Sequence, residues 1–274
     1  MSELVALGKA GVAIRTANDA GRGALVGYLP AGFPTYDGGV DAIKALIDGG
    51  VDVLEIGLPY SDPVMDGVTI QRAAEVALAG GLRTRDVLST VEKVAAYSDV
   101  PVLVMTYWNP IERYGVDRFA ADLAGVGGAG LITPDLIPDE GAEWIAAADK
   151  YDLDKVFLVS PSSTDARIRM TTAACRGFVY ATAVMGVTGA RDKPSDLAAP
   201  LVARAKAVTG LPIGVGLGIS NADQAAGVAA FADAAIVGAA LVKALADGGP
   251  VGVRTLAEAL SEGVRREPRT TVDR

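Results

Sequence analysis

The chain has 274 residues, and its 33 acidic against 25 basic side chains give a net charge of -8, which disfavours binding to the phosphate backbone of a nucleic acid. Half of the residues are hydrophobic and 33 are glycine, a composition that is typical of a large folded core with many tight turns. The sequence contains no histidine, which excludes Ser-His-Asp and Cys-His catalysis. It contains one cysteine, Cys175, and a zinc site is improbable with one cysteine and no histidine.

The first predicted element is a helix within residues 3–18, ahead of any strand. Charged residues interrupt its apolar positions, so it does not fit a signal or transit peptide. No apolar run in the sequence is long enough to span a bilayer. Together with the lone cysteine, these features lead us to expect a cytoplasmic protein without a membrane segment.

Short, nearly continuous apolar runs rich in β-branched residues recur along the chain, as expected for strands that are buried on both faces of a parallel sheet. They read GALVGYLP from residue 23, VDVLEIGL from 51, PVLVMTY from 101, AGLITP from 129, KVFLVS from 155, GFVYATA from 177, LPIGVG from 211 and DAAIVG from 233.

Longer segments with apolar residues three and four apart lie between these runs and predict helices, for example residues 37–50, 141–151 and 195–210. Eight such alternations predict a single (β/α)8 barrel, a TIM barrel, with extra helices at the N-terminus and late in the chain. We expect the barrel to occupy residues 1–265 and residues 266–274 to form a frayed tail.

The most informative stretch is LEIGLPYSDPVMDGVTIQ, residues 54–71, which places three carboxylates in and after the second strand. A carboxylate such as Glu55 inside an apolar strand either is desolvated, with a raised pKa, or opens onto a polar cavity. Alternatively, it has a purely structural role, in which a partner within the barrel satisfies it or it faces outward between the helices. Asp62 and Asp66 follow in a turn, with Thr69 as a candidate N-cap of the next helix. Because active sites of barrels form at the carboxyl ends of the strands, Glu55 and Asp66 can converge on one ligand.

Three later loops predict a phosphate site. Gly216 and Gly218 follow the seventh strand, where Ser220 or Asn221 can begin a helix, and Gly238 begins a helix after the eighth. The loop at residues 185–194, after the sixth strand, carries two more glycines and could close over the same pocket. Backbone amides at helix ends bind phosphate without net positive charge, although each glycine could equally serve only as a turn.

Read together, the stretch at residues 54–71 and the ordered segments GVTGAR, GVGLGIS and IVGAALVK resemble the tryptophan synthase α subunit over nearly the whole chain. The resemblance implies a lyase of tryptophan biosynthesis that cleaves indole-3-glycerol phosphate to indole and glyceraldehyde 3-phosphate, with no cofactor or metal on this subunit. It implies that Glu55 is the acid-base residue at the glycerol hydroxyl and at indole C3, and that Asp66 faces the indole nitrogen.

The resemblance also implies a set of substrate-binding residues that line the indole pocket, orient Asp66 or offer backbone amides to the phosphate. They are Tyr28, Tyr180, Thr188, Gly189, Leu217, Gly218, Gly238 and Ala239. This chain differs from the family at three places. Ala239 replaces a usual serine, and residues 181–185 read ATAVM where the family commonly has a polar segment. Met65 and Val68 replace the small residue and the proline that often flank Asp66.

The implied partner is a β subunit that holds pyridoxal phosphate and receives indole, in an α2β2 heterotetramer. Asp62, Pro63 and Asn109 match positions near that interface, although turn residues need no partner to explain them. Two other functions fit the pattern: an isomerase that acts on another phosphosugar, and a non-catalytic activator of a partner enzyme.

Overall fold

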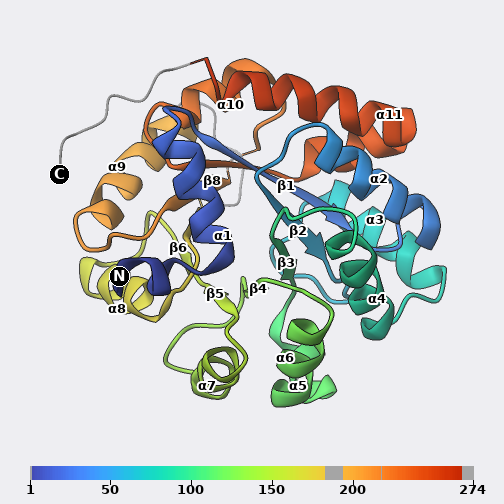
Figure 1. Ribbon diagram of the computed structural model, residues 1–274, viewed down its shortest axis with the longest axis horizontal. Helices are drawn as coiled ribbons and strands as arrows, with labels where there is room; N and C mark the ends of the chain where they lie inside the picture. The colour runs from blue at the N-terminus through green and yellow to red at the C-terminus, as the bar shows by residue number, and fades with distance from the viewer. Residues whose placement is uncertain (1, 183–193, 217, 267–274) are drawn as a thin grey trace.

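The structure is a computed structural model that describes residues 2–182, 194–216 and 218–266. Its strands form one parallel sheet that curls into a barrel, and helices surround the barrel on the outside (Figure 1). The strands are β1 (Ala24–Pro30), β2 (Val53–Gly57), β3 (Val102–Met105), β4 (Gly130–Ile132), β5 (Asp154–Val156), β6 (Leu158–Val159), β7 (Val179–Thr182), β8 (Ile213–Gly216) and β9 (Ala234–Val237). Every predicted strand is confirmed.

The barrel closes through its fifth predicted strand, which Phe157 divides into β5 and β6. The sheet order is β5-β4-β3-β2-β1-β9-β8-β7-β6, so the two halves of this strand form its two edges. Residues of β5 pair with β4, and residues of β6 pair with β7. Because one residue separates the two halves in the sequence, the edges meet and the predicted (β/α)8 architecture is confirmed.

The helices include the predicted segments and some that the sequence analysis did not separate. They are α1 (Ser2–Asp19), α2 (Tyr36–Asp48), α3 (Val68–Ala79), α4 (Thr84–Ala95), α5 (Trp108–Tyr114), α6 (Val116–Gly125), α7 (Ala142–Lys150), α8 (Asp165–Ala174), α9 (Pro194–Lys206), α10 (Ala222–Ala229) and α11 (Ala239–Gly263). Two helices, not one, connect β2 to β3 and β3 to β4. The late extra helix is the continuation of α11 beyond its kink at Gly249. Within the described part of the chain, none of these helices is long and apolar enough to cross a membrane.

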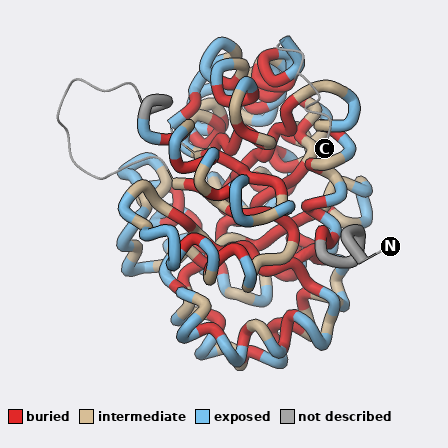
Figure 2. The backbone as a smooth tube through the Cα atoms, turned by 90° about the vertical axis from the view of Figure 1, so that its left-hand side faces the viewer, coloured by how far each residue is buried: buried red, intermediate tan, exposed pale blue. Residues whose placement is uncertain are grey.

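Helix α1 covers the end of the barrel where the strands begin. Its Ala10 and Ile14 side chains belong to the apolar cluster that fills the barrel interior. The Ala10 N–H donates to Oδ2 of Asp154, the first residue of β5, at 2.8 Å. Figure 2 shows the buried strands at the centre and exposed positions on the outer helices. With one end sealed in this way, an open site is left at the carboxyl ends of the strands.

One local prediction is wrong. Thr69 does not cap α3, because the helix begins one residue earlier, at Val68, and its N-cap is Gly67, which has no side chain. Gln71 instead stabilises the turn from within the helix, since its Nε2 donates to the Asp66 carbonyl oxygen at 2.7 Å. This geometry fixes the backbone of Asp66 immediately before the helix.

Candidate active site

Glu55 lies in the middle of β2 and points into the barrel. It shares a strand face with Val53, which packs in the interior apolar cluster, and the alternation of side chains along a strand places both on the same side. Glu55 is 1% exposed, and its Oε1 has no hydrogen-bond partner among the described residues. Burial raises the pKa of this carboxyl to about 8. Glu55 is therefore a desolvated carboxyl group in the barrel interior, which is one of the environments that the sequence left open.

Two tyrosines accompany Glu55 in the barrel interior. Tyr28 on β1 is the direct register partner of Glu55, and it is 8% exposed. Burial, followed by the charge of Glu55, raises the pKa of the Tyr180 hydroxyl on β7 well above its ordinary value. For Tyr28 burial is again the main cause of a raised pKa, and the charges of Asp66 and Glu55 add to it. Both phenols therefore remain protonated and can donate hydrogen bonds to a ligand.

Asp66 lies in the turn between β2 and α3, and Tyr107 at the end of β3 holds this turn. The Tyr107 hydroxyl accepts hydrogen bonds from the backbone N–H groups of Met65 at 2.9 Å and of Asp66 at 3.2 Å. A phenol can accept two hydrogen bonds and donate one, so the Tyr107 O–H can still donate to the Asp66 carboxylate. Burial raises the pKa of Asp66, and hydrogen bonding by Tyr107 opposes this rise.

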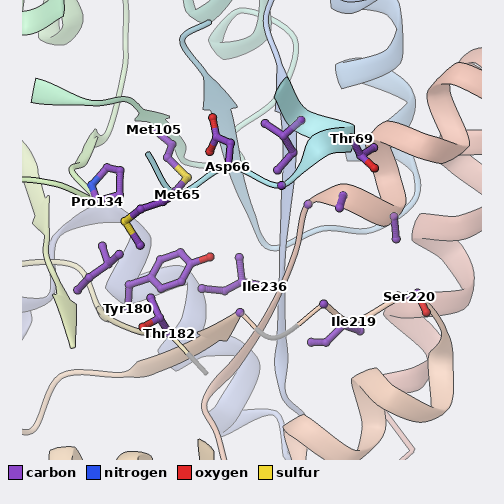
Figure 3. Close-up of a pocket in the computed structure, with 18 of the residues that line it drawn as sticks. Met65, Asp66, Thr69, Met105, Pro134, Tyr180, Thr182, Ile219, Ser220 and Ile236 are labelled. Atoms are coloured by element: carbon purple, nitrogen blue, oxygen red, sulfur yellow. The ribbon is translucent and has the colours of Figure 1, made fainter. Parts of the chain in front are cut away.

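A cavity of about 610 Å³ opens at the carboxyl ends of the strands. Asp66, Tyr180, Gly218, Gly238 and Ala239 line it, so the structure brings these predicted residues from four parts of the chain to one place. In Figure 3 the ring of Tyr180 extends into the cavity, with its hydroxyl toward Ile236. Glu55 and Tyr28 are not among the lining residues; they lie deeper in the barrel.

The strand ends beside the cavity are glycines for steric reasons. A Cβ atom on Gly216 would lie 2.5 Å from the Tyr180 hydroxyl, and one on Gly57 would lie 2.2 Å from that of Tyr28. Gly218 has a φ of 70°, a conformation that favours glycine. Gly238 is the N-cap of α11, whose first residues, Ala239 and Ala240, line the cavity, and Asn221 caps α10 by accepting from the Gln224 N–H at 3.0 Å. Thr188, Gly189 and Leu217 lie outside the described residues.

The three residues expected near a partner lie on the same face of the molecule. Asp62 is exposed in the loop after β2, where its Oδ2 accepts from Ser61 Oγ at 2.6 Å, and Pro63 follows it half-buried. Asn109 on α5 is exposed, and its Nδ2 donates to the Tyr60 hydroxyl at 3.0 Å. The Tyr60 ring packs against that of Tyr107 at 5.5 Å, which connects this face to the turn that holds Asp66.

Comparison with known proteins assigns this arrangement to a family. Residues 14–266 match the family described as "Tryptophan synthase alpha chain". The chain is 58% identical over 263 residues to the tryptophan synthase alpha chain of Acidothermus cellulolyticus, covering 95% of this chain and 98% of the relative. The chain belongs to the tryptophan synthase alpha chain family. It is therefore a lyase of tryptophan biosynthesis, and the resemblance drawn from the sequence is confirmed.

Solved structures agree with the family assignment. A Mycobacterium tuberculosis tryptophan synthase structure superimposes with a TM-score of 0.89 at 52% identity, covering 94% of this chain and 98% of that one. The tryptophan synthase alpha subunit of Legionella pneumophila gives a TM-score of 0.83 at 33% identity, with coverage of 94% and 99%. For a tryptophan synthase alpha chain, the isomerase interpretation of the phosphate loops is no longer needed.

Sequence reasoning missed two residues of this alpha chain site. Tyr107 ends a buried apolar run, and its contact with the Asp66 turn spans about forty residues, so no local pattern signals it. Lys243 lines the cavity from α11. Its position four residues after Ala239, on the same helix face, is a signal that could have identified it. Within the described residues, no group of three or more His, Cys, Asp or Glu side chains could hold a metal ion.

Proposed function

We propose that this chain cleaves indole-3-glycerol phosphate to indole and glyceraldehyde 3-phosphate, with Glu55 and Asp66 as its catalytic residues. The observation that supports this most is the contrast between the two carboxylates. Glu55 is desolvated, and its Oε1 has no partner in the described part of the chain, whereas Asp66 lines the cavity beside a hydrogen-bonding tyrosine. Carboxyl groups whose environments differ in this way can take different roles in acid-base catalysis.

The proton balance of the reaction suits a single acid-base residue. Cleavage moves one proton from the glycerol hydroxyl to indole C3, with no net gain or loss. With a pKa of about 8, Glu55 begins largely protonated at neutral pH and can donate its proton to C3. The resulting carboxylate then removes the hydroxyl proton, the C–C bond breaks, and its electron pair returns to the indole ring. Glu55 is protonated again at the end of the cycle.

Asp66 has a complementary role in this proposal. Protonation of C3 places positive charge on the indole nitrogen, and an ionised carboxylate that accepts the indole N–H stabilises that charge. Tyr107 favours the ionised form by hydrogen bonding. Thr188 would orient Asp66 from the loop after β7, and Tyr28 and Tyr180 would line the indole pocket.

The phosphate would lie at the other side of the cavity, against the ends of β8 and β9. Gly238 and Ala239 are at the start of α11, and Gly218 lies in the loop that leads to α10. Backbone N–H groups at a helix N-terminus bind phosphate well. Gly189 and Leu217 complete the proposed set of amides. Ala239 contributes its N–H but no hydroxyl.

We further propose that a β subunit carrying pyridoxal phosphate is the partner, in an α2β2 assembly within the cytoplasm. The M. tuberculosis neighbours are structures of tryptophan synthase, and one is described as bound to an aminoacrylate. The face with Asp62, Pro63 and Asn109 also exposes apolar side chains, with Val64 at 77% and Val68 at 60% exposure. Exposed apolar residues that adjoin polar turns are typical of a protein interface.

Turnover of indole-3-glycerol phosphate by the Glu55→Gln and Asp66→Asn variants, with and without a β subunit, tests the proposal. Glu55→Gln should reduce kcat by several orders of magnitude and leave substrate binding largely intact. Glu258→Gln, which changes an exposed carboxylate on α11, is the matched control and should keep full activity. Near-normal turnover by Glu55→Gln would remove Glu55 from the mechanism. If wild type and variant alike lack turnover yet stimulate the partner, the chain is a non-catalytic activator.

A further inference from the structure

The cavity has an unusual charge distribution for a site that receives a phosphate ester. Of the described residues that line it, Lys243 is the only basic one and Asp66 the only acidic one. A substrate phosphate would bring up to two negative charges into the cavity that Asp66 also lines, in a chain whose net charge is already -8. One cation at the cavity therefore has a large effect on whether the phosphate can enter.

The position of Lys243 suits contact with this phosphate. It follows Ala239, the first residue of α11, by four positions, so the two residues lie on one face of the helix. Long side chains on a helix lean toward its N-terminus and cover the preceding turn. A rotamer of this kind would bring the Lys243 amine over the first turn of α11, whose first residues, Ala239 and Ala240, line the cavity.

Among the described residues that line the cavity at the ends of β8 and β9, the other side-chain donors are absent or already used. Ala239 has no hydroxyl. Both the backbone N–H and the hydroxyl of Ser220 donate to Oε1 of Gln224, at 2.7 Å and 3.0 Å. Lys243 is consequently the side chain on this wall that can add a charged hydrogen bond to those from the backbone.

Lys243 has an ion-pair partner on α11 that it can exchange for another anion. Its Nζ is paired with the carboxylate of Asp247, one turn further along α11. The two side chains are 71% and 64% exposed, and exposed pairs at this spacing contribute little stability. Exchange of Asp247 for a phosphate dianion at a helix N-terminus therefore costs little.

We propose that Lys243 is a substrate-binding residue that exchanges its ion pair with Asp247 for one with the substrate phosphate. The proposal deepens the lyase function and rests on it, because the phosphate in question is that of indole-3-glycerol phosphate. Asp247 acts as a competitor for the amine, so the two residues together set the affinity for the phosphate end of the substrate.

The reverse reaction separates the phosphate end from the indole end. For Lys243→Met, the KM for glyceraldehyde 3-phosphate should rise about fivefold to tenfold, the effect of one exposed charged hydrogen bond. The KM for indole and kcat should stay within a factor of two. Asp247→Asn should lower the KM for glyceraldehyde 3-phosphate, since it removes the competitor. Lys150→Met, which removes another lysine from an exposed ion pair, is the control and should change neither KM.

Binding of glycerol 3-phosphate, measured by calorimetry at low and high salt, tests Lys243 independently of turnover. We expect weaker binding and a smaller salt dependence for Lys243→Met than for wild type. Equal affinities for wild type and variant, or no binding by wild type, would overturn the role of Lys243. Binding that depends on Lys243 in a chain without lyase turnover would instead overturn the proposed reaction alone.

Discussion

Replacing Glu55 with glutamine should make the stability of the protein less dependent on pH, and this follows directly from the burial of the side chain. The pKa of Glu55 is about 8 in the folded protein and 4.5 for the ordinary side chain. The folded state therefore holds this proton more tightly than the unfolded state between these two pKa values. Stability that depends on the protonated form is fully present below the lower pKa, and it declines as pH rises through this window.

The size of the effect can be worked out from the two pKa values. Each pH unit inside the window changes the free energy of unfolding by about 1.4 kcal/mol, so the change between about pH 5.5 and pH 8.5 is roughly 3 kcal/mol. Glutamine has the same shape as protonated glutamate and does not titrate. The Glu55→Gln variant should thus gain roughly 3 kcal/mol relative to wild type over this interval.

Urea unfolding of wild type and variant at both pH values measures this difference. Other titrating groups, such as Asp66 and Asp154, are present in both proteins, so their contributions cancel in the comparison. Any cost of burying the glutamine amide is independent of pH and cancels as well. Glu258→Gln provides the reference for an exposed carboxylate. A stability difference between wild type and Glu55→Gln that is constant with pH would refute the claim that Glu55 is desolvated in the folded chain.

Three further predictions concern the same site. The kcat/KM of the free enzyme should fall as pH rises through about 8, because Glu55 then loses the proton that it donates; a rate that stays flat to about pH 10 would contradict this. Tyr107→Phe should reduce kcat roughly tenfold and move the acid limb of the pH profile to higher pH, since the Asp66 carboxyl loses the hydrogen bond that lowers its pKa. Tyr114→Phe, which removes a remote hydroxyl bonded to Asp122, is the control for that assay. Gly57→Ala should destabilise the protein by about 1 to 3 kcal/mol in thermal or urea unfolding, because the new methyl group would displace the Tyr28 hydroxyl. Gly125→Ala meets no atom within 4 Å and should be neutral or stabilising.

The strands could be predicted from the sequence because burial on both faces leaves a purely local signature. Each is an apolar run bounded by glycine, proline or polar residues, and all eight runs form barrel strands. The break at Phe157 could not be predicted in this way. It arises because Lys155 pairs with β4 and Leu158 with β7, so the two halves of the strand form opposite edges of the sheet, which is a property of the closed barrel.

The residues of the candidate site likewise differ in whether a local sequence pattern could predict them. Glu55, Asp66 and the glycines could be predicted because acids at a strand end and glycines before a helix are unusual patterns within a single segment of the sequence. Tyr107 could not be predicted, because its role depends on the Asp66 turn that another segment places beside it. Lys243 could have been predicted from its position four residues after Ala239, on the same face of α11. The prediction that Thr69 caps α3 failed for a related reason. Thr69 is a good cap by composition, but the N-cap is Gly67, two residues earlier, and Gln71 bonds to the Asp66 carbonyl oxygen before it.

In the proposed mechanism, the different environments of the two carboxylates explain why both Glu55 and Asp66 are needed. A group that must first give a proton and then take one back works best when it starts neutral. Burial provides this for Glu55, whose Oε1 has no hydrogen-bond partner among the described residues. A group that must stabilise positive charge works only when ionised, and Asp66 has both a hydrogen-bonding tyrosine and access to the cavity. Exchanging the two environments would leave a protonated group at the indole nitrogen and an ionised one at C3. The fold therefore assigns the roles through burial, since the two side chains share the same acid group.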